Sequence, residues 1–353
     1  MDMTDFDKYI IQSEPEKCEK ARIWQTAIGL QDVDGLKPSE YLIRTAEKHI
    51  EGDITIAEVK SLIDNYYESK GVRKEVESEG TEEADKVAAR ITEILSERAF
   101  SFTPDFLIKI HQRLFSGVYE HAGMIRQNNI SKREWVLDGD TVIYSGYDMI
   151  RQTLDYDFSQ EQDTDYPSMS ADEAIKRVCR FVSGIWQIHP FAEGNTRTTA
   201  VFAMKYLQTF GFKPDNSLFK DHSWYFRNAL VRANYNNFHK GVSATDTFLI
   251  RFFRNLLLGE NNPLSNREMH ISNIQSLIPK SQNDTLGCTL EEMAILRFLQ
   301  TRPDARQEEI ARHIGKSLST VKRITPSLIE RGFLARENGK RNGRWVVKYL
   351  ADN

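Results

Sequence analysis

The sequence lacks the features that mark membrane, secreted and zinc-knuckle proteins. It contains no run of about eighteen apolar residues, which argues against a membrane-spanning helix. The first residues, MDMTDFDKYIIQSEPEK, are acidic and have no apolar segment of the kind found in secretion signals. The three cysteines, Cys18, Cys179 and Cys288, are far apart and odd in number, so they fit neither a disulfide framework nor a metal knuckle. We therefore expect a cytoplasmic protein with no membrane contact.

Charge is distributed unevenly along a chain whose composition is otherwise that of an ordinary globular protein. Of the 353 residues, 40% are hydrophobic and 28% are charged. Residues 285–353 carry 13 basic and 8 acidic side chains, whereas residues 1–284 carry 34 basic and 43 acidic ones. A basic C-terminal piece on an acidic body indicates two modules with different partners.

Apolar spacing and capping residues predict that most of the chain is helical. Ser13-Glu-Pro-Glu16 and Ser170-Ala-Asp-Glu173 have the form of capping boxes, and Thr103-Pro104 is a favourable helix start. Further helices are expected near 38–50, 54–68, 195–210, 221–234 and 245–258. Residues 128–147 differ, because apolar residues flank Asp138-Gly139-Asp140, a turn signal that predicts a β-hairpin.

One loop between two predicted buried helices concentrates chemical groups. It reads HPFAEGNTR and begins at His189, whose imidazole can take a proton near neutral pH. Glu193 can hold Mg²⁺ through oxygen, and Asn195 opens a helix whose free N–H groups attract phosphate. Arg197 offers a guanidinium fork for phosphate oxygens. A lone histidine or Gly-Asn pair is usually structural, but this combination favours phosphoryl-type transfer.

The loop resembles the signature of the Fic domain family, His-x-Phe-x-Asp/Glu-Gly-Asn-Gly-Arg-x-x-Arg. The upstream run FLIKIHQRLFSGVYEHAGMIRQNNI is similar to the family's helix and Gly-x-x-Arg turn, and the resemblance covers roughly residues 85–260. It implies a mainly α fold, with a Fic-type helical domain that carries one β-hairpin flap. It also implies transfer of AMP from ATP to a Tyr, Thr or Ser hydroxyl of a target protein, with Mg²⁺ as cofactor.

The resemblance assigns a role to each residue of the loop. His189 would deprotonate the target hydroxyl, Phe191 would be buried to fix the loop, and Glu193 would bind Mg²⁺. The residues implied to bind the nucleotide are Gly194, Asn195, Thr196, Arg197 and Asn234. An equal alternative for Asn234 is a helix C-cap. In the flap, Trp135, Val136 and Leu137 would dock a target segment by strand addition.

Two positions depart from the family signature. Thr196 replaces a glycine, so its backbone must be right-handed. Ala200 replaces the last arginine, which normally holds the γ-phosphate, and one charge-assisted contact is worth about 1.5–3 kcal/mol. The inhibitory pattern of many Fic proteins, Ser/Thr-x-x-x-Glu-Gly/Asn, is also not matched, and the nearest candidate is Glu51-Gly52. We therefore expect that the chain lacks the usual internal lock, in which the Glu of this pattern pairs with the last arginine.

The C-terminal residues resemble a winged helix-turn-helix, a small α+β domain. Helices are expected behind Thr289 and near 305–313 and 317–330, followed by two strands on either side of the basic turn ENGKRNGR. An alternative to DNA binding is a protein-docking or dimer module with a solvated charged face. The residues expected to contact DNA phosphates are Lys322, Arg323, Lys340, Arg341 and Arg344.

These patterns divide the chain into an N-terminal helical region (1–84), a Fic core (85–260), a linker (261–288) and a winged helix-turn-helix domain (289–353). AMP transfer from ATP to a protein is the expected function. One alternative is a DNA-binding transcriptional regulator whose Fic core senses nucleotide, and another is a transferase with a different nucleotide or diphosphate donor. The target protein is not identified by the sequence, and the resemblance leaves a homodimer open.

Overall fold

Helices make up most of the described chain, as the apolar spacing predicts. The computed structural model describes residues 6–12, 14–69, 76–212, 218–276, 288–337 and 343–348. Ser13, with its predicted capping box, and the predicted DNA contacts Lys340 and Arg341 lie outside these ranges. No helix in the described ranges combines the length and the apolar character needed to cross a membrane.

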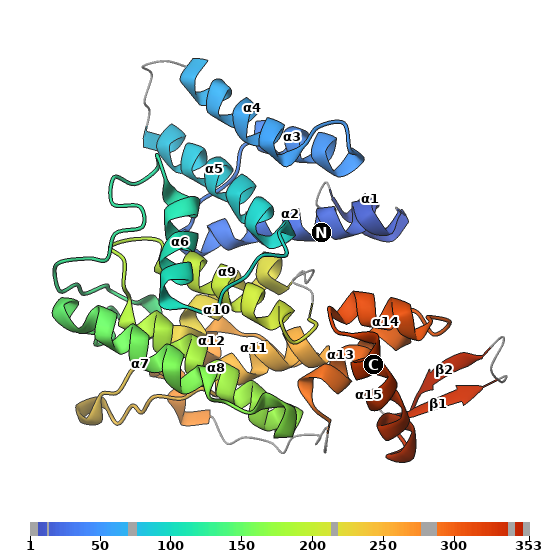
Figure 1. Ribbon diagram of the computed structural model, residues 1–353. Coiled ribbons are helices and arrows are strands. Elements are labelled where there is room, and N and C mark those ends of the chain that lie inside the picture. Colours follow the sequence, from blue (N-terminus) through green and yellow to red (C-terminus); the bar gives the residue numbers. More distant parts are fainter. Residues whose placement is uncertain are drawn as a thin grey trace.

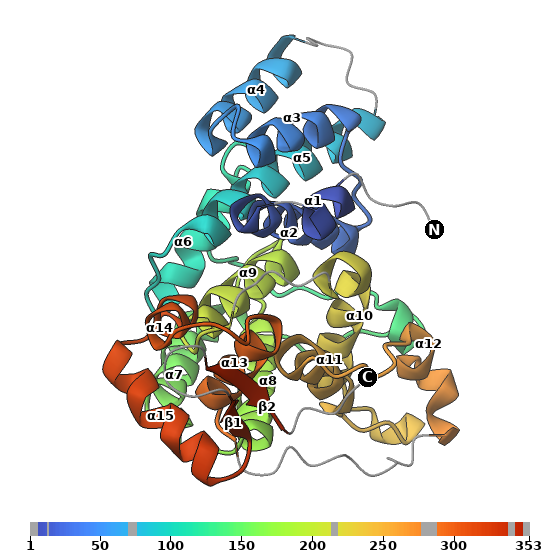
Figure 2. The same ribbon diagram turned by 90° about the vertical axis from the view of Figure 1, so that its right-hand side faces the viewer.

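The N-terminal helices form one end of the molecule. They are α1 (Asp7–Gln12), α2 (Pro15–Gly29), the 3-10 turn η1 (Leu30–Asp34), α3 (Glu40–Glu51), α4 (Ile56–Ser69) and α5 (Val76–Ser96). In Figures 1 and 2, α2 lies between α3–α5 on one side and the helices α9 and α10 on the other. This position lets the turn after α2 contact α9, the helix that begins in the candidate loop.

The middle of the chain holds the helices that frame the loop. They are α6 (Pro104–Phe115), α7 (Ile150–Gln162), α8 (Ala171–Ile188), α9 (Asn195–Gln208), α10 (Leu218–Ala233) and α11 (Thr247–Leu258), with the short α12 (Asn266–Met269) behind them. The Ser170 capping box is confirmed, since its side chain accepts from the Glu173 N–H and the Glu173 carboxylate bonds back. Thr103 caps α6 as predicted.

The predicted β-hairpin at residues 128–147 is wrong. Among the described residues the only strands lie near the C-terminus, and this segment is an irregular turn around η2 (Trp135–Leu137). Both Val136 and Leu137 are fully buried, so the alternating exposure of a strand is lost. Asp138 has φ of 58°, and the Glu134 and Gly139 N–H groups close the turn by bonds to the carbonyls of Asp140 and Glu134.

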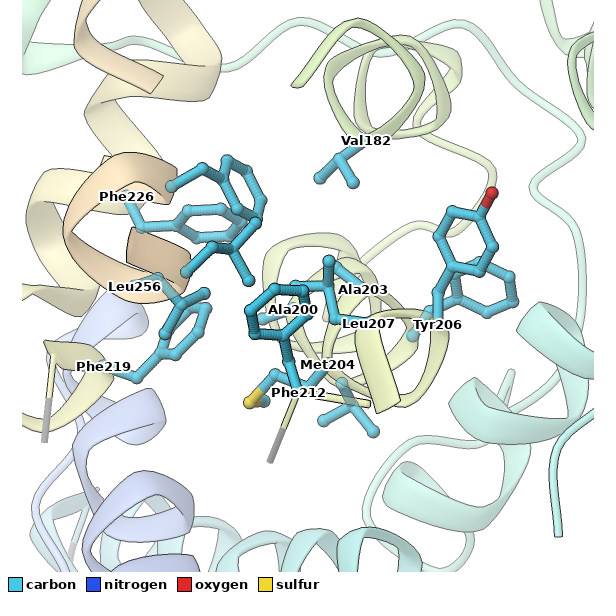
Figure 3. Close-up of a cluster of buried hydrophobic side chains, with 14 of the residues drawn as sticks. Val182, Ala200, Ala203, Met204, Tyr206, Leu207, Phe212, Phe219, Phe226 and Leu256 are labelled. Atoms are coloured by element: carbon cyan, nitrogen blue, oxygen red, sulfur yellow. The ribbon is translucent and has the colours of Figure 1, made fainter. Parts of the chain in front are cut away.

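Apolar packing behind the loop occupies the position of the family's last arginine. Ala200 is fully buried, and Figure 3 shows it among Ala203, Met204 and Leu207 of the same helix and side chains of the facing helices. A guanidinium there would lose its water without gaining a partner, which is costly. The side of α9 that carries Ala200 therefore serves the core.

The C-terminal elements form the predicted winged helix-turn-helix. They are α13 (Leu290–Thr301), α14 (Gln307–Ile314), α15 (Leu318–Glu330) and the antiparallel strands β1 (Leu334–Glu337) and β2 (Arg344–Val347). In Figure 1 the two strands lie at the edge of the molecule. Helix α13 packs on α8 and α11, and Arg297 donates to the carbonyls of Leu256 and Leu257 at the end of α11 (2.9 and 2.8 Å). The module is thereby joined to the helical body.

Candidate active site

His189 presents one proton-free ring nitrogen inside the loop. It ends α8 in a left-handed conformation (φ 52°), which is unusual for a residue other than glycine and is typical of functional sites. Its Nδ1 lies 3.2 Å from the Trp186 carbonyl, which can only accept, so Nδ1 carries the proton. The buried Nε2 has no hydrogen-bond partner. This tautomer leaves Nε2 free to accept a proton.

The surroundings of His189 keep the ring neutral. The side chain is 3% exposed, and the Tyr144 ring covers it at a centroid distance of 4.2 Å. Burial, and then the Coulombic effect of the Lys132 ammonium, lower the pKa of His189 to about 3. The imidazole is therefore an uncharged base at neutral pH.

Arg126 holds the loop in place through hydrogen bonds to its backbone. This residue closes the Gly-x-x-Arg turn noted in the sequence, and it is buried. Its Nε donates to the His189 carbonyl (2.7 Å), and its other nitrogens donate to the carbonyls of Asn128 and Ser145 (2.7 and 2.5 Å). Its backbone N–H also donates to Pro190 (2.9 Å). Arg126 is thus committed to positioning the loop rather than to a ligand.

The side chains at the start of α9 hold the loop through contacts within the protein. The Asn195 amide exchanges two hydrogen bonds with the backbone of Phe191 (3.0 and 2.7 Å). Thr196 accepts from the Trp186 indole (3.0 Å) and is right-handed, as expected from its β-branch. Gly194 has φ of 74°, and a Cβ there would lie 2.4 Å from Phe115. The first N–H groups of a helix have no partner within the helix, and such helix starts attract anions.

Glu193 is the exposed acceptor of the loop. Its side chain is 55% exposed, and its carboxylate pairs with the Lys132 ammonium at 2.8 Å. Its carbonyl accepts from His111, whose other ring nitrogen accepts from the Gly123 N–H. No group of three or more acidic, His or Cys side chains in the described residues could hold a metal. A single carboxylate fits Mg²⁺, which usually takes its other ligands from phosphates and water.

Arg197 is bonded to acidic groups from the N-terminal helices. Its side chain is 1% exposed and pairs with Asp34 (2.8 Å) and Glu83 (2.5 Å). Gln31 and Tyr119 accept two further bonds from it, at 3.1 Å each. Glu83, Gln31 and Tyr119 accept hydrogen bonds from the guanidinium, and Asp34 forms an ion pair with its Nε without a hydrogen bond. In this structure the Arg197 guanidinium is therefore occupied by partners within the protein.

The expectation that the chain lacks the usual Glu–Arg lock stays a prediction, because position 200 is an alanine and the acidic contacts reach Arg197 instead. Neither contact fits the inhibitory pattern, since Glu83 precedes Ala84 and residue 34 is an aspartate. Glu51, the nearest match to the pattern, pairs with Lys17 instead. Helix α2 can lie very close to α10 because residue 29 is a glycine, since a Cβ there would lie 2.3 Å from the Lys220 backbone. This close contact holds the turn that carries Asp34.

Sequence comparisons place this loop in a known domain. Residues 101–207 match the Fic/DOC family. The chain contains a Fic/DOC domain. Over 114 residues it is 32% identical to a protein adenylyltransferase, VbhT, of Bartonella schoenbuchensis, and the match covers 32% of this chain and 23% of that protein. The chain thus spans less than a quarter of the length of this relative. Residues 293–338 match the IclR helix-turn-helix domain.

The remaining predicted residues, Asn234 and Trp135 to Leu137, make contacts with parts of the protein other than the loop. Asn234 donates to the carbonyls of Leu230 and Ser183 and to the Ser183 hydroxyl, so in this structure it joins α10 to α8. Trp135 is 48% exposed and contacts the ring of His270. With Val136 and Leu137 buried and no strand present, the docking mode by strand addition is not supported here.

Several side chains that shape the Fic site were missed in the sequence. Tyr144, Lys132 and His111 lie 45, 61 and 82 residues before their partners in the loop and reach it through contacts already described. Lys132 and Tyr144 lie in no recognisable motif, whereas His111 belongs to the upstream run that is similar to the family's helix. The sequence signal that comes closest to predicting these contacts is the Gly-x-x-Arg turn. Its Arg126 bonds to the loop and so brings the residues that follow it in the chain close to the loop.

Acid should destabilise the folded chain through three buried histidines, one in the N-terminal helical region and two in the Fic domain. Burial is the main cause that lowers the pKa of His49 to about 4, His111 to about 4 and His189 to about 3. Unfolded histidines titrate near pH 6.5, so below that pH the unfolded chain binds protons that the folded chain does not. We expect each histidine to lower the free energy of unfolding by about 1.4 kcal/mol per pH unit between pH ~6.5 and ~4.

Urea unfolding at pH 7, 6 and 5 measures this slope. The His189→Ala variant should show a shallower pH dependence than the unchanged chain. His239 is exposed, so His239→Ala is the matched control and should keep the full slope. Equal slopes in all three proteins would contradict the assignment.

Proposed function

We propose that this chain transfers the AMP moiety of ATP to a hydroxyl side chain of a target protein. The observation that carries the proposal is the proton-free Nε2 of His189, buried without a partner beside the start of α9. A base next to a phosphate-binding helix start is what nucleotidyl transfer requires of a protein, since most of the catalysis is positioning and charge stabilisation. The likeness to a protein adenylyltransferase agrees with this choice.

The chain's own residues perform the proposed steps in order. Nε2 of His189 accepts the proton of the target hydroxyl as its oxygen attacks the α-phosphorus of ATP. The bond from the α-phosphorus to the bridging oxygen breaks, and pyrophosphate leaves. The N–H groups at the start of α9 hold the α-phosphate, and Arg197, once released from its carboxylates, neutralises the leaving group. Mg²⁺ at Glu193 would supply charge neutralisation on the phosphates.

The irregular segment beside His189 offers a surface for the target protein. Arg126 bonds to Ser145, and the Tyr147 N–H donates to Asn129, so residues 124–129 and 143–149 lie together next to the loop. Exposed apolar groups of this kind often mark protein interaction sites. Four of the seven exposed large hydrophobic side chains among the described residues lie in these two stretches: Met124, Ile143, Tyr147 and Met149.

Labelled ATP tests the proposal. The purified chain is incubated with Mg²⁺ and a cell lysate, in parallel with ATP labelled at the α- or the γ-phosphate. Label from the α-position should appear on protein, and label from the γ-position should not. No labelling of any protein, including the chain itself, by the unchanged chain and by a variant with the Arg197 carboxylates removed would reject AMP transfer.

A different donor is the second form of the same chemistry. It is favoured by the burial of Ala200 in an apolar cluster, which leaves the usual γ-phosphate contact without a replacement at that position. A panel of nucleoside triphosphates and diphosphate-linked nucleotides, read by intact mass of the modified protein, separates the donors. A mass increase with another donor and none with ATP would replace AMP transfer by that reaction.

DNA binding by the C-terminal domain is a second candidate function, favoured by the match to the IclR helix-turn-helix. Lys322 and Arg323 are exposed on α15, the second helix of the pair, and Arg344 is exposed on the wing. A hollow of about 900 Å³ lies beside the wing, and Arg306, Arg336 and Arg344 contribute to its lining. Guanidinium groups around a hollow suit phosphate oxygens.

Replacing Lys322 and Arg323 together with alanine should weaken binding to duplex DNA and lower the salt dependence. Each lost phosphate contact is expected to reduce the slope of log K against log salt by about one. Fluorescence anisotropy with a labelled duplex at several salt concentrations measures it. Arg44, exposed on α3, provides the matched control, Arg44→Ala. Equal slopes for all three proteins would assign the domain to protein docking instead.

A further inference from the structure

The Fic site needs a cation for the outer phosphates of its donor, and most of its arginines are already committed. Arg126 donates to backbone carbonyls of the loop, and Arg227 pairs with the buried Glu134 at 2.7 Å. Arg197 is bonded to two carboxylates. Position 200, where the family signature has an arginine, is an alanine within the core.

Lys132 differs from these arginines in its partner and in its exposure. Its ammonium pairs with Glu193, the proposed metal ligand, and the two side chains are 28% and 55% exposed. Ion pairs that remain in contact with water contribute little to stability, so this one is easily exchanged. A divalent cation held by Glu193 would compete with the ammonium for this carboxylate, which would leave the ammonium of Lys132 available to an anion.

The position of Lys132 is fixed even though its side chain can exchange partners. Its backbone N–H donates to the Thr141 hydroxyl at 3.1 Å, which joins the two limbs of the segment beside the loop. Its ammonium donates a hydrogen bond to Glu193 and also lowers the pKa of His189 by its charge. A cation next to both the proposed base and the proposed metal ligand is well placed to contact the phosphates of a donor bound between them.

We propose that Lys132 binds the donor's phosphates beyond the α-phosphate, exchanging Glu193 for them when the metal binds. The inference rests on the proposed function, since it assumes a nucleoside triphosphate donor. It makes Lys132 a specificity residue that distinguishes ATP from AMP, supplied by the irregular segment rather than by α9.

Calorimetric titration of the full chain with ATP and with AMP, both in the presence of Mg²⁺, tests this role. Lys132→Ala should weaken ATP binding by about 10- to 100-fold, as expected for one charge-assisted contact, and change AMP binding less than about twofold. Lys132→Arg should restore most of the ATP affinity. Arg133, exposed next to it, gives the matched control Arg133→Ala, which should bind both nucleotides normally.

The possible failures are distinguishable. If Lys132→Ala binds ATP as tightly as the unchanged chain, the role of Lys132 is wrong and the proposed transfer stands. An equal loss of ATP and AMP affinity would likewise overturn it, because that result indicates a damaged loop. If neither the unchanged chain nor a variant with Asp34 and Glu83 neutralised binds any nucleotide, the proposed function fails together with this inference.

Discussion

Replacing His189 with alanine should reduce AMP transfer by about 10²- to 10⁴-fold, the usual contribution of a positioned general base. The physical reason is that Nε2 of His189 is the buried ring nitrogen without a partner beside the start of α9. Because the proposed role of the ring is to accept a proton and not to hold phosphate, nucleotide affinity should change little. Labelled-ATP transfer and calorimetric binding, measured on the same preparation, separate the two effects.

Two controls guard this result against a folding defect. His239→Ala, at an exposed position, should transfer AMP at the normal rate. The urea midpoint of His189→Ala at pH 7 shows whether the variant remains folded. Transfer that persists within about tenfold in a folded His189→Ala protein would assign the base to another residue.

Neutralising Asp34 and Glu83 together, as Asp34→Asn and Glu83→Gln, should raise both nucleotide binding and transfer by tenfold or more. Their carboxylates bond to Arg197, so a diphosphate must displace them before it can use the guanidinium. A closed state favoured by about 1.4 kcal/mol already costs tenfold in apparent affinity. Initial rates at subsaturating ATP measure the gain.

Thermal unfolding provides an independent readout of the same variant. Removing the carboxylates leaves Arg197 as a buried charge without a counter-ion, which is destabilising by about 3–5 kcal/mol. Pyrophosphate should restore that stability and therefore raise the unfolding temperature of the variant more than that of the unchanged chain. Glu82, which pairs with Lys86, gives the control Glu82→Gln. Lower transfer in a stable double variant would show that the carboxylates support the site instead of closing it.

Local signals in the sequence predicted the helices and the loop well. The capping boxes at Ser170 and Thr289 are present because each is complete within four residues. The hairpin prediction failed because Asp138-Gly139-Asp140 is a genuine turn, but its neighbours Val136 and Leu137 both face the core. A turn signal fixes where the chain reverses, whereas a strand also requires alternating burial and a paired neighbour.

The state of the site could not be predicted, since it depends on contacts between distant parts of the chain. Gln31 and Glu83 reach Arg197 from 166 and 114 residues away, and no pattern in either segment announces that contact. The proton on Nδ1 of His189 likewise depends on the geometry at the end of α8. The motif in the sequence shows which chemical groups the loop carries. Packing between distant segments decides which of these groups are free to contact a ligand.

The joint between α13 and the helical body has a consequence for where the enzyme would act. Arg297 caps α11 from inside the C-terminal domain, so α15 and His189 belong to one continuously packed body. If the C-terminal domain binds a DNA duplex, the imidazole of His189 would be held at a fixed distance and orientation relative to the double helix. Only proteins that reach the side of the duplex where His189 lies could then be modified. The position of the DNA site would therefore limit which target proteins are available.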